Sequence, residues 1–304
     1  MRKLKYLSAL CKSFSFVYMM SQLVLIVTDR LHISIPALYR WRNAYIRNLI
    51  ETLASSNSIV PRACSAKENA DRRIWTMWYQ GLESAPPLIH SCVASMQQRS
   101  IVTVLDEDTL TSWIDVAPSI QSKLGHAISY THFSDYVRFS VLARHGGMWL
   151  DATVLCIGEL PEESFQLPLY TFRQDAPPNP KTACSWWKGY IMGTDGSSGL
   201  FDFCKRLLET YWERYDVLVD YFLIDHLLSY ALSLPEYKSY CKDIPMVDKN
   251  IYWLERHYMD TWTPKDAIKM PSFNKLSYKT MNISSVPHDS VWNHVIDAKY
   301  ESAK

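Results

Sequence analysis

The stretch Thr131–Cys156 of this chain reads THFSDYVRFSVLARHGGMWLDATVLC and combines a helix pattern with a strand pattern that follows it directly. Its apolar residues Val137, Val141 and Leu142 recur at helical spacing, which predicts an amphipathic helix over residues 131–145. Asp135 and Arg138 are three residues apart in this helix, so their side chains share one face and can reach the same ligand. We therefore expect a helix with one buried stripe and one polar face.

The second half of the stretch predicts a strand that begins after two glycines. Gly146 stands where a helix ends with a residue of positive φ, and Gly147 lets the backbone reverse into an extended run. From residue 148 the period is two, which puts Trp149, Asp151 and Thr153 on one side of the strand. An ionised Asp151 is costly there unless it meets a cation or hydrogen-bond donors. The carboxyl end of an open α/β sheet, where ligands bind, would supply them.

Alternating strands and helices around this stretch predict an α/β fold with a mostly parallel sheet. The predicted strands cover residues 73–79, 101–105, 148–154 and 190–193. The predicted helices start at Pro86-Pro87 or cover residues 131–145, 200–215 and 217–232.

Composition narrows the class of protein. With 304 residues, of which 48% are hydrophobic, the chain can bury a full core and is neither disordered nor fibrous. Its seven cysteines are scattered and include no C-x-x-C pair, which argues against a disulfide framework or a structural zinc site. Unpaired thiols of this kind are typical of the cytosol, where we place the protein.

The first fifty residues carry an excess of positive charge. They hold eight Lys or Arg against a single acidic residue, Asp29, so this head has a net charge of +7, whereas the rest of the chain is mildly acidic. A basic, apolar-rich head predicts an anionic partner. We expect a membrane surface and no nucleic acid, because the body shows no basic groove with interleaved aromatic residues.

The apolar run Phe14–Thr28 is too short to span a bilayer, which takes about 20 residues. No small-residue cleavage site follows it, so we reject a signal peptide. Two interpretations remain open: a helical subdomain packed on the rest of the protein, or an element lying in the plane of the membrane. The polar segment 55–67 reads as a linker, which divides the chain into an N-terminal segment, residues 1–68, and a catalytic domain, residues 69–304.

The central stretch contains an S-D-x-x-R-x-x-x-L-x-x-x-G-G-x-W-x-D-A-T pattern, and it resembles the signature of bacterial capsular polysaccharide synthesis glycosyltransferases. The residues that carry the resemblance are Ser134, Asp135, Arg138, Leu142, Gly146, Gly147, Trp149, Asp151, Ala152 and Thr153. More distantly, the pattern is similar to the yeast-type mannosyltransferases and the large clostridial glucosylating toxins. Those proteins have a second aspartate where this chain has Thr153.

The resemblance implies a GT-A type fold and transfer of a hexose from a nucleotide sugar, UDP-linked, with retention at the anomeric carbon. The implied acceptor is a lipid-linked glycan intermediate of capsular or other surface polysaccharide, used at the inner face of the cell membrane, where the protein is peripheral. Two alternatives stay open: a toxin-like enzyme that modifies a host protein, and an inactive sugar-binding scaffold, which the missing second acid would allow.

The resemblance also assigns roles. Asp135 and Arg138 would bind hydroxyls of the donor sugar, and Asp151 would contact the ribose or hold Mn²⁺ or Mg²⁺ at the diphosphate, helped by the Thr153 hydroxyl. The expected donor-binding residues are Ile74, Trp75, Trp78, Ser134, Asp135, Arg138, Gly147, Asp151, Lys275 and Lys279. The expected catalytic residues are Asp135, Arg138, Asp151, Asp225 and His226.

Several of these residues have a structural alternative. The two tryptophans of strand 73–79 stack on uracil or belong to the core, and Lys275 and Lys279 hold phosphate or face solvent. Asp225 and His226 line the cleft or stabilise their helix. The aromatic residues Trp186, Trp187 and Tyr190 either stack on an acceptor sugar or pack in the core.

Overall fold

The computed structural model describes residues 2–62, 72–173, 181, 183 and 187–301. The helices are α1 (Arg2–Ser13), α2 (Phe16–Arg30), α3 (Pro36–Ser56), α4 (Pro87–Gln97), α5 (Pro118–Gln121), α6 (Tyr130–His145), α7 (Glu163–Gln166), α8 (Leu200–Arg214), α9 (Leu223–Ala231), α10 (Trp253–His257) and α11 (Val291–Glu301). The strands are β1 (Arg73–Met77), β2 (Ile101–Leu105), β3 (Gly147–Leu150), β4 (Val154–Cys156), β5 (Ile191–Thr194) and β6 (Phe273–Lys275).

A four-stranded sheet with the order β2-β1-β3-β5 forms the centre of the molecule. Strand β1 pairs in parallel with both β2 and β3, and its Trp75 stands opposite Trp149 of β3. Strand β5 is antiparallel to β3. The prediction of an α/β fold with a mostly parallel sheet is therefore confirmed.

The predicted strand over residues 148–154 is wrong in one respect, because it is two strands in two sheets. Strand β3 ends at Leu150, the chain turns with a hydrogen bond of 2.9 Å from the Val154 amide to the Asp151 carbonyl, and β4 then pairs with β6 in an antiparallel sheet. Side chains alternate along a strand in either sheet, so the period of the sequence cannot show where the chain leaves one sheet and enters the other. The turn places Asp151 and Thr153 between the two sheets.

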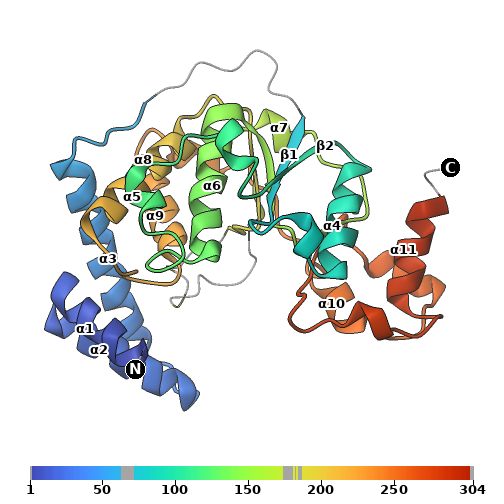
Figure 1. The fold of residues 1–304 in the computed structure, drawn as a ribbon, viewed down its shortest axis with the longest axis horizontal. Coiled ribbons are helices and arrows are strands. Elements are labelled where there is room, and N and C mark those ends of the chain that lie inside the picture. Colours follow the sequence, from blue (N-terminus) through green and yellow to red (C-terminus); the bar gives the residue numbers. More distant parts are fainter. Residues whose placement is uncertain (1, 63–71, 174–180, 182, 184–186, 302–304) are drawn as a thin grey trace.

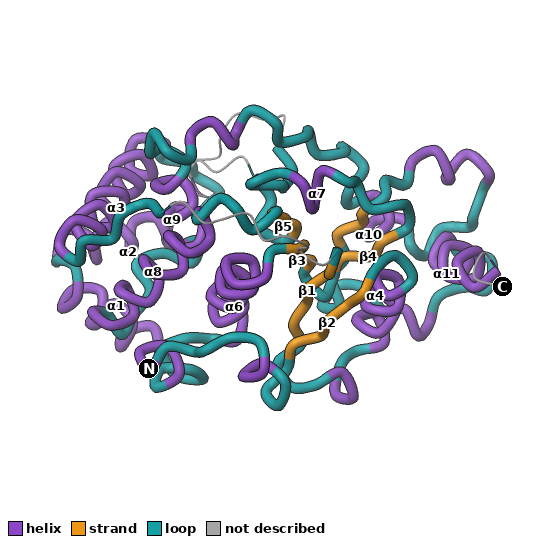
Figure 2. The backbone as a smooth tube through the Cα atoms, turned by 90° about the horizontal axis from the view of Figure 1, so that it is seen from above, coloured by secondary structure: helices purple, strands orange, loops and turns teal. Residues whose placement is uncertain are grey.

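Helices cover both faces of the central sheet (Figure 1 and Figure 2). On one side α6 packs on β1 and β3 and is itself covered by α8, with α9 and α3 beyond. On the other side lie α4, the small sheet and the C-terminal helices α10 and α11. The sheet is thus buried between two helical layers, and its carboxyl-terminal edge is the place left for a ligand.

The predicted helix over residues 217–232 begins only at Leu223. The Asp220 carboxylate accepts a hydrogen bond of 2.7 Å from the Phe222 amide and pairs with Arg42 at 2.9 Å. An aspartate that bonds its own backbone two residues on offers an alternative to the helix. Residues 217–222 therefore form an irregular segment ahead of α9.

The three N-terminal helices pack on the body of the protein. Leu10, Tyr18, Ile46 and Ile50 are buried in the same hydrophobic cluster as residues of α6, α8 and α9. Along the described helices, none is both long and apolar enough to cross a membrane. The predicted domain boundary at residue 68 falls outside the described residues and stays a prediction.

Candidate functional site

Helix α6 holds two charged side chains against the sheet. It begins with a cap, the Ser129 hydroxyl accepting from the His132 amide, and ends at Gly146, whose φ is +68°. Arg138 is only 5% exposed, and its Nη1 lies 3.1 Å from Oδ1 of Asp135. The predicted i, i+3 pair is therefore formed, on a buried face of the helix.

Asp151 lies at the carboxyl end of β3, at the centre of the candidate site. Its Oδ1 accepts hydrogen bonds of 3.0 Å from Arg138 Nη2 and 3.0 Å from the indole Nε1 of Trp149. Its Oδ2 lies 3.3 Å from the Lys275 ammonium. The expectation that Asp151 meets a cation and hydrogen-bond donors is confirmed: it meets two cations and an indole.

Lys275 enters the site from β6, the strand that pairs with β4. Its ammonium also donates a hydrogen bond to the hydroxyl of Thr153, and it lies 5.3 Å from the ring centre of Tyr190. The Leu276 amide donates to the Thr153 carbonyl at 2.9 Å, which fixes the strand beside the turn. Residues far apart in sequence thus supply the two halves of one charged cluster.

The two carboxylates of the cluster have opposite pKa shifts. Burial acts to raise the pKa of Asp151, but the charges of Lys275 and Arg138 outweigh burial and hold it below the ordinary value. Burial raises the pKa of Asp135 to about 7, because Arg138 offsets burial only in part and the charges of Asp151 and Asp225 add to the shift. Asp151 is therefore ionised at neutral pH, whereas burial favours the protonated form of Asp135.

A pocket of about 420 Å³ opens beside this cluster, at the carboxyl ends of β1 and β3. It is lined by Met77, Trp78, Tyr79, Gln80, Ser129, Tyr130, Thr131, Ser134, Trp149, Asp151, Ala152, Thr153 and Tyr278. The rings of Tyr79 and Tyr130 stack at 4.8 Å and form part of its wall. Sequence reasoning missed both tyrosines; the position of Tyr79, directly after the first strand, was the available signal.

The predicted donor-binding residues of β1 and β3 divide into two groups. Trp78 lines the pocket, but Trp75 is 1% exposed, and its Nε1 donates to the Gly146 carbonyl at 2.9 Å. Ile74 is fully buried in the core. Gly147 has a φ of +85°, and a Cβ there would lie 2.7 Å from the Arg73 carbonyl oxygen, so its glycine is explained by the backbone.

Asp225 and His226 face different surroundings, although they are adjacent. Asp225 accepts a hydrogen bond of 2.9 Å from the Trp187 indole and is close enough to Asp135 to raise its pKa. His226 is buried, with Nε2 4.0 Å from Asp220, and burial followed by the charge of Arg42 lowers its pKa to about 3. Asp225 therefore acts on the charged cluster through its charge, and His226 is a neutral residue of the packing between α3 and α9.

The remaining predicted residues are placed as follows. Ser134 lines the pocket and donates its hydroxyl to the Thr131 carbonyl at 2.7 Å. Lys279 is exposed, 5.9 Å from the ring centre of Tyr278, and does not line the pocket. Trp186 lies outside the described residues. Lys275 is thus the one of the two predicted lysines that reaches Asp151.

The residues at Asp151 do not fit a divalent metal ion. Mg²⁺ and Mn²⁺ are held by carboxylates that are available to them, whereas this single carboxylate already contacts a guanidinium and an ammonium. The second expected ligand, the Thr153 hydroxyl, accepts from Lys275. Within the described residues, no group of three or more His, Cys, Asp or Glu side chains is arranged to hold a metal.

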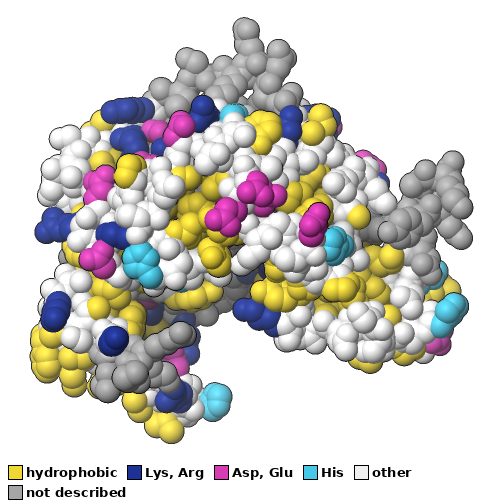
Figure 3. Space-filling view, in the orientation of Figure 1, with side chains coloured by type: hydrophobic (Ala, Val, Ile, Leu, Met, Phe, Trp, Pro, Cys, Tyr) yellow, Lys and Arg dark blue, Asp and Glu magenta, His cyan; other side chains and the backbone are white. Residues whose placement is uncertain are grey.

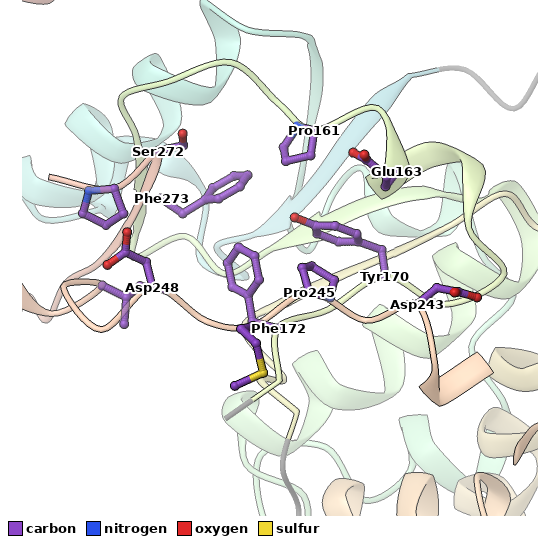
Figure 4. A pocket seen from close by; sticks show the side chains of 12 residues that line it. Pro161, Glu163, Tyr170, Phe172, Asp243, Pro245, Asp248, Ser272 and Phe273 are labelled. Carbon is purple, nitrogen blue, oxygen red and sulfur yellow. The ribbon is translucent and has the colours of Figure 1, made fainter. Parts of the chain in front are cut away.

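A second pocket, of about 390 Å³, is lined in part by Phe273 of β6 and by the two residues that precede it (Figure 4). The rings of Tyr170, Phe172 and Phe273 form its wall, with successive centre distances of 5.8 and 5.8 Å. The rest of its lining is Pro161, Glu163, Asp243, Pro245, Met246, Asp248, Ile251, Pro271 and Ser272, which includes three carboxylates and no Lys or Arg. The described lining is therefore aromatic and acidic, and one of its residues, Met246, is contacted by the Arg173 guanidinium, whose Nε lies 3.1 Å from Sδ.

Comparison with known proteins places the chain in a family. Residues 37–295 match the family described as "Capsular polysaccharide synthesis protein". Curated protein sequences give no match. Among solved structures, the chain is similar to one titled "PaToxG Glycosyltransferase", with 15% sequence identity, a TM-score of 0.39, and coverage of 88% of this chain and 96% of that chain. The match over residues 37–295 covers most of the sequence, and the chain therefore belongs to the capsular polysaccharide synthesis protein family.

Proposed function

We propose that this protein is a glycosyltransferase that moves a hexose from a UDP-sugar to a lipid-linked glycan intermediate in capsular polysaccharide synthesis. The observation that carries the proposal is the charged cluster of Asp135, Arg138, Asp151 and Lys275 beside the first pocket. Transfer from a nucleotide sugar requires a group that neutralises the leaving diphosphate and groups that bind sugar hydroxyls. The proposal is supported by this cluster and by membership of the capsular polysaccharide synthesis protein family.

The first pocket suggests how the donor lies. The rings of Trp78, Tyr79 and Tyr130 offer faces on which a uracil ring can stack. Lys275 is the cation for the diphosphate, and Asp135 with Arg138 is the acceptor-and-donor pair for hydroxyls of the hexose. Retention at the anomeric carbon is part of the proposal, on the strength of the family resemblance.

We place the acceptor sugar in the second pocket. Aromatic faces bind the apolar side of a sugar ring, and carboxylates accept hydrogen bonds from its hydroxyls. Phe273, which lines this pocket, lies two residues before Lys275 on β6, roughly 7 Å along the strand, so the proposed acceptor site is near the Lys275 end of the charged cluster.

An acceptor that carries a lipid would require the enzyme to work at the membrane, and we propose that the protein binds the membrane peripherally. Helix α2 and the turn after it expose the apolar side chains Phe16, Val17, Met20, Val24, Ile26, Val27, Leu31 and Ile33. Figure 3 shows hydrophobic and basic side chains together on the end of the molecule formed by α1 and α2. Arg42 is not part of this surface, because it is buried against Asp220. We propose that this face, termed the α2 surface, lies in the headgroup region of an anionic bilayer.

The proposal is tested by donor binding and hydrolysis. The melting temperature of the purified protein is measured with UDP, GDP and a panel of UDP- and GDP-sugars, because a ligand that binds only the folded state raises it. We expect one UDP-hexose to raise it more than UDP does, and to be slowly hydrolysed to UDP and free hexose. Binding without hydrolysis or transfer would favour the inactive scaffold, and the lack of any nucleotide effect would contradict the proposal.

A further inference from the structure

We propose that Lys275 takes the place of a divalent cation at the donor diphosphate, so that the transferase works without a metal. This inference rests on the proposed function and specifies its chemistry. It follows from where the ammonium lies: between Asp151 and Thr153, the two residues that the sequence offers as ligands for a metal ion.

The position of Lys275 is fixed by backbone contacts on both sides. Its Cα is paired with Val154 in the small sheet, and its amide donates to the Ile251 carbonyl at 2.9 Å. Its side chain is 20% exposed, and its ammonium contacts Asp151 and Thr153, two residues that line the first pocket. A lysine held by a strand in this way is a built part of the site and not a solvated surface charge.

The charges around Lys275 argue against a second cation. A divalent ion bound to Asp151 Oδ2 would lie beside the ammonium, which is itself 3.3 Å from that oxygen. The other carboxylate oxygen is taken by Arg138 and the Trp149 indole. Threonine in place of a second aspartate removes the extra negative charge that would be needed to hold both cations.

The ammonium is suited to the reaction. It has three N–H donors, of which two are directed at Asp151 and Thr153, and the third can bind an oxygen of the β-phosphate. When the bond from the anomeric carbon to the phosphate oxygen breaks, the electron pair stays on that oxygen and UDP leaves. The acceptor hydroxyl forms the new bond to the anomeric carbon and passes its proton to the same phosphate oxygen. Lys275 stabilises the negative charge that develops there.

The arrangement also explains the role of Asp151. Its ionised carboxylate, with a pKa below the ordinary value, lies between two cations and holds the ammonium at the end of β3. In this scheme Asp151 is a positioning residue for Lys275 and has no metal to bind.

The experiment compares the wild type with Lys275→Ala and Lys275→Gln, and uses Lys265→Ala, an exposed lysine of the same C-terminal region, as the matched control. Donor hydrolysis is measured in EDTA and in Mn²⁺, and the affinities for UDP and for uridine are measured by calorimetry. We expect wild-type and Lys265→Ala activity to be unchanged by EDTA. The two Lys275 variants should lose about 100-fold in activity, which is the usual cost of removing one preorganised donor.

Binding separates a phosphate contact from a general loss of structure. Both Lys275 variants should bind UDP about 10-fold more weakly or worse and bind uridine as the wild type does, since only the phosphate contact is removed. Mn²⁺ should restore part of the activity of Lys275→Ala, because the oxygens of Asp151 and Thr153 become available to it. If Lys275→Ala does not fold, the inference is still tested by UDP binding to Lys275→Gln and by the effect of EDTA on the activity of the wild type.

Two results would overturn the inference. One is a wild-type activity that EDTA abolishes and Mn²⁺ restores; the other is a Lys275 variant that binds UDP as tightly as the wild type. Failure of the proposed function looks different: the wild type would then bind neither UDP nor any UDP-sugar, in EDTA or in Mn²⁺, and both proposals would fall together.

Discussion

The guanidinium Nη2 of Arg138 lies 3.0 Å from Oδ1 of Asp151, and this contact joins helix α6 to the end of strand β3. Arg138 is 5% exposed and also pairs with Asp135, so one buried cation serves two carboxylates. A buried charge that loses its partner is costly. Function and stability are therefore linked at this position, and substitutions here must be tested for both.

Asp151→Asn should lower transfer by about 100-fold or more, since the ammonium of Lys275 and the guanidinium of Arg138 lose the charge that orients them. The variant should fold with a reduced melting temperature. The amide has nearly the same size and shape as the carboxylate, but it no longer neutralises the charges of Arg138 and Lys275. Asp115→Asn is the control: its carboxylate is 94% exposed and pairs with Arg144 on the surface. Near wild-type transfer by Asp151→Asn would contradict the assignment of this cluster to the donor site.

Trp75 and Trp78 should respond differently to replacement by alanine. Trp75→Ala removes a fully packed ring and its hydrogen bond to Gly146, so the free energy of unfolding should fall by about 3–5 kcal/mol. Trp78→Ala should cost less stability than Trp75→Ala, because its ring is only half-buried against the neighbouring hydrophobic cluster, and should weaken UDP binding by roughly 10-fold, because it removes a wall of the first pocket. Urea unfolding and calorimetry with UDP distinguish the two, and UDP affinity unaffected by Trp78→Ala would exclude the base from this wall.

The pKa of Asp135 predicts a pH dependence of stability. In the folded state the pKa is raised to about 7, mainly by burial, so between pH 4 and 7 the folded protein holds a proton that the unfolded chain has released. This contribution to stability is complete below the ordinary pKa and is lost as the pH rises through 7. Urea unfolding between pH 5 and 8 should show the wild type losing stability relative to Asp135→Asn. Parallel curves for the two proteins would show that Asp135 is ionised throughout.

The second pocket should bind simple sugars without a nucleotide. In saturation-transfer NMR with a panel of methyl hexopyranosides, we expect signals that are lost in Phe172→Ala and Asp248→Asn, two variants of its wall and rim. Hydrolysis of the donor should be unchanged in both, because neither residue lines the first pocket. Equal signals for the wild type and both variants would show that the sugars do not bind in the second pocket.

The α2 surface should hold the protein on anionic vesicles. The variant Phe16→Ser/Val17→Ser/Leu31→Ser, which changes three side chains each 62% exposed, should lose flotation with vesicles that contain phosphatidylserine. The control is Ile268→Ser, an 88% exposed apolar residue in the C-terminal part of the chain. Alkaline carbonate should release the wild type. Flotation equal for the triple variant and the control would contradict the membrane proposal. Removing the N-terminal helices is a poor test, because Leu10 and Tyr18 belong to the main core.

The elements with local signals could be predicted from the amino-acid sequence. The helix that carries Asp135 and Arg138, its end at Gly146 and the strand after Gly147 follow from side-chain period and from backbone conformations that glycine adopts readily. The family membership also follows from sequence, because the pattern around Asp151 is itself a sequence property.

Which distant residues contact one another could not be predicted from the amino-acid sequence. The pairing of β4 with β6 brings Lys275 to Asp151, 124 positions earlier, and no local pattern encodes that distance. The degree of burial assigned Trp75 and His226 to the core and left Trp78 at the first pocket and Asp225 near the charged cluster. Neighbouring residues of one strand or helix look alike in the sequence and differ only in what packs against them. Contacts between distant segments depend on how the layers pack, and those contacts determine the charge and chemistry of the site.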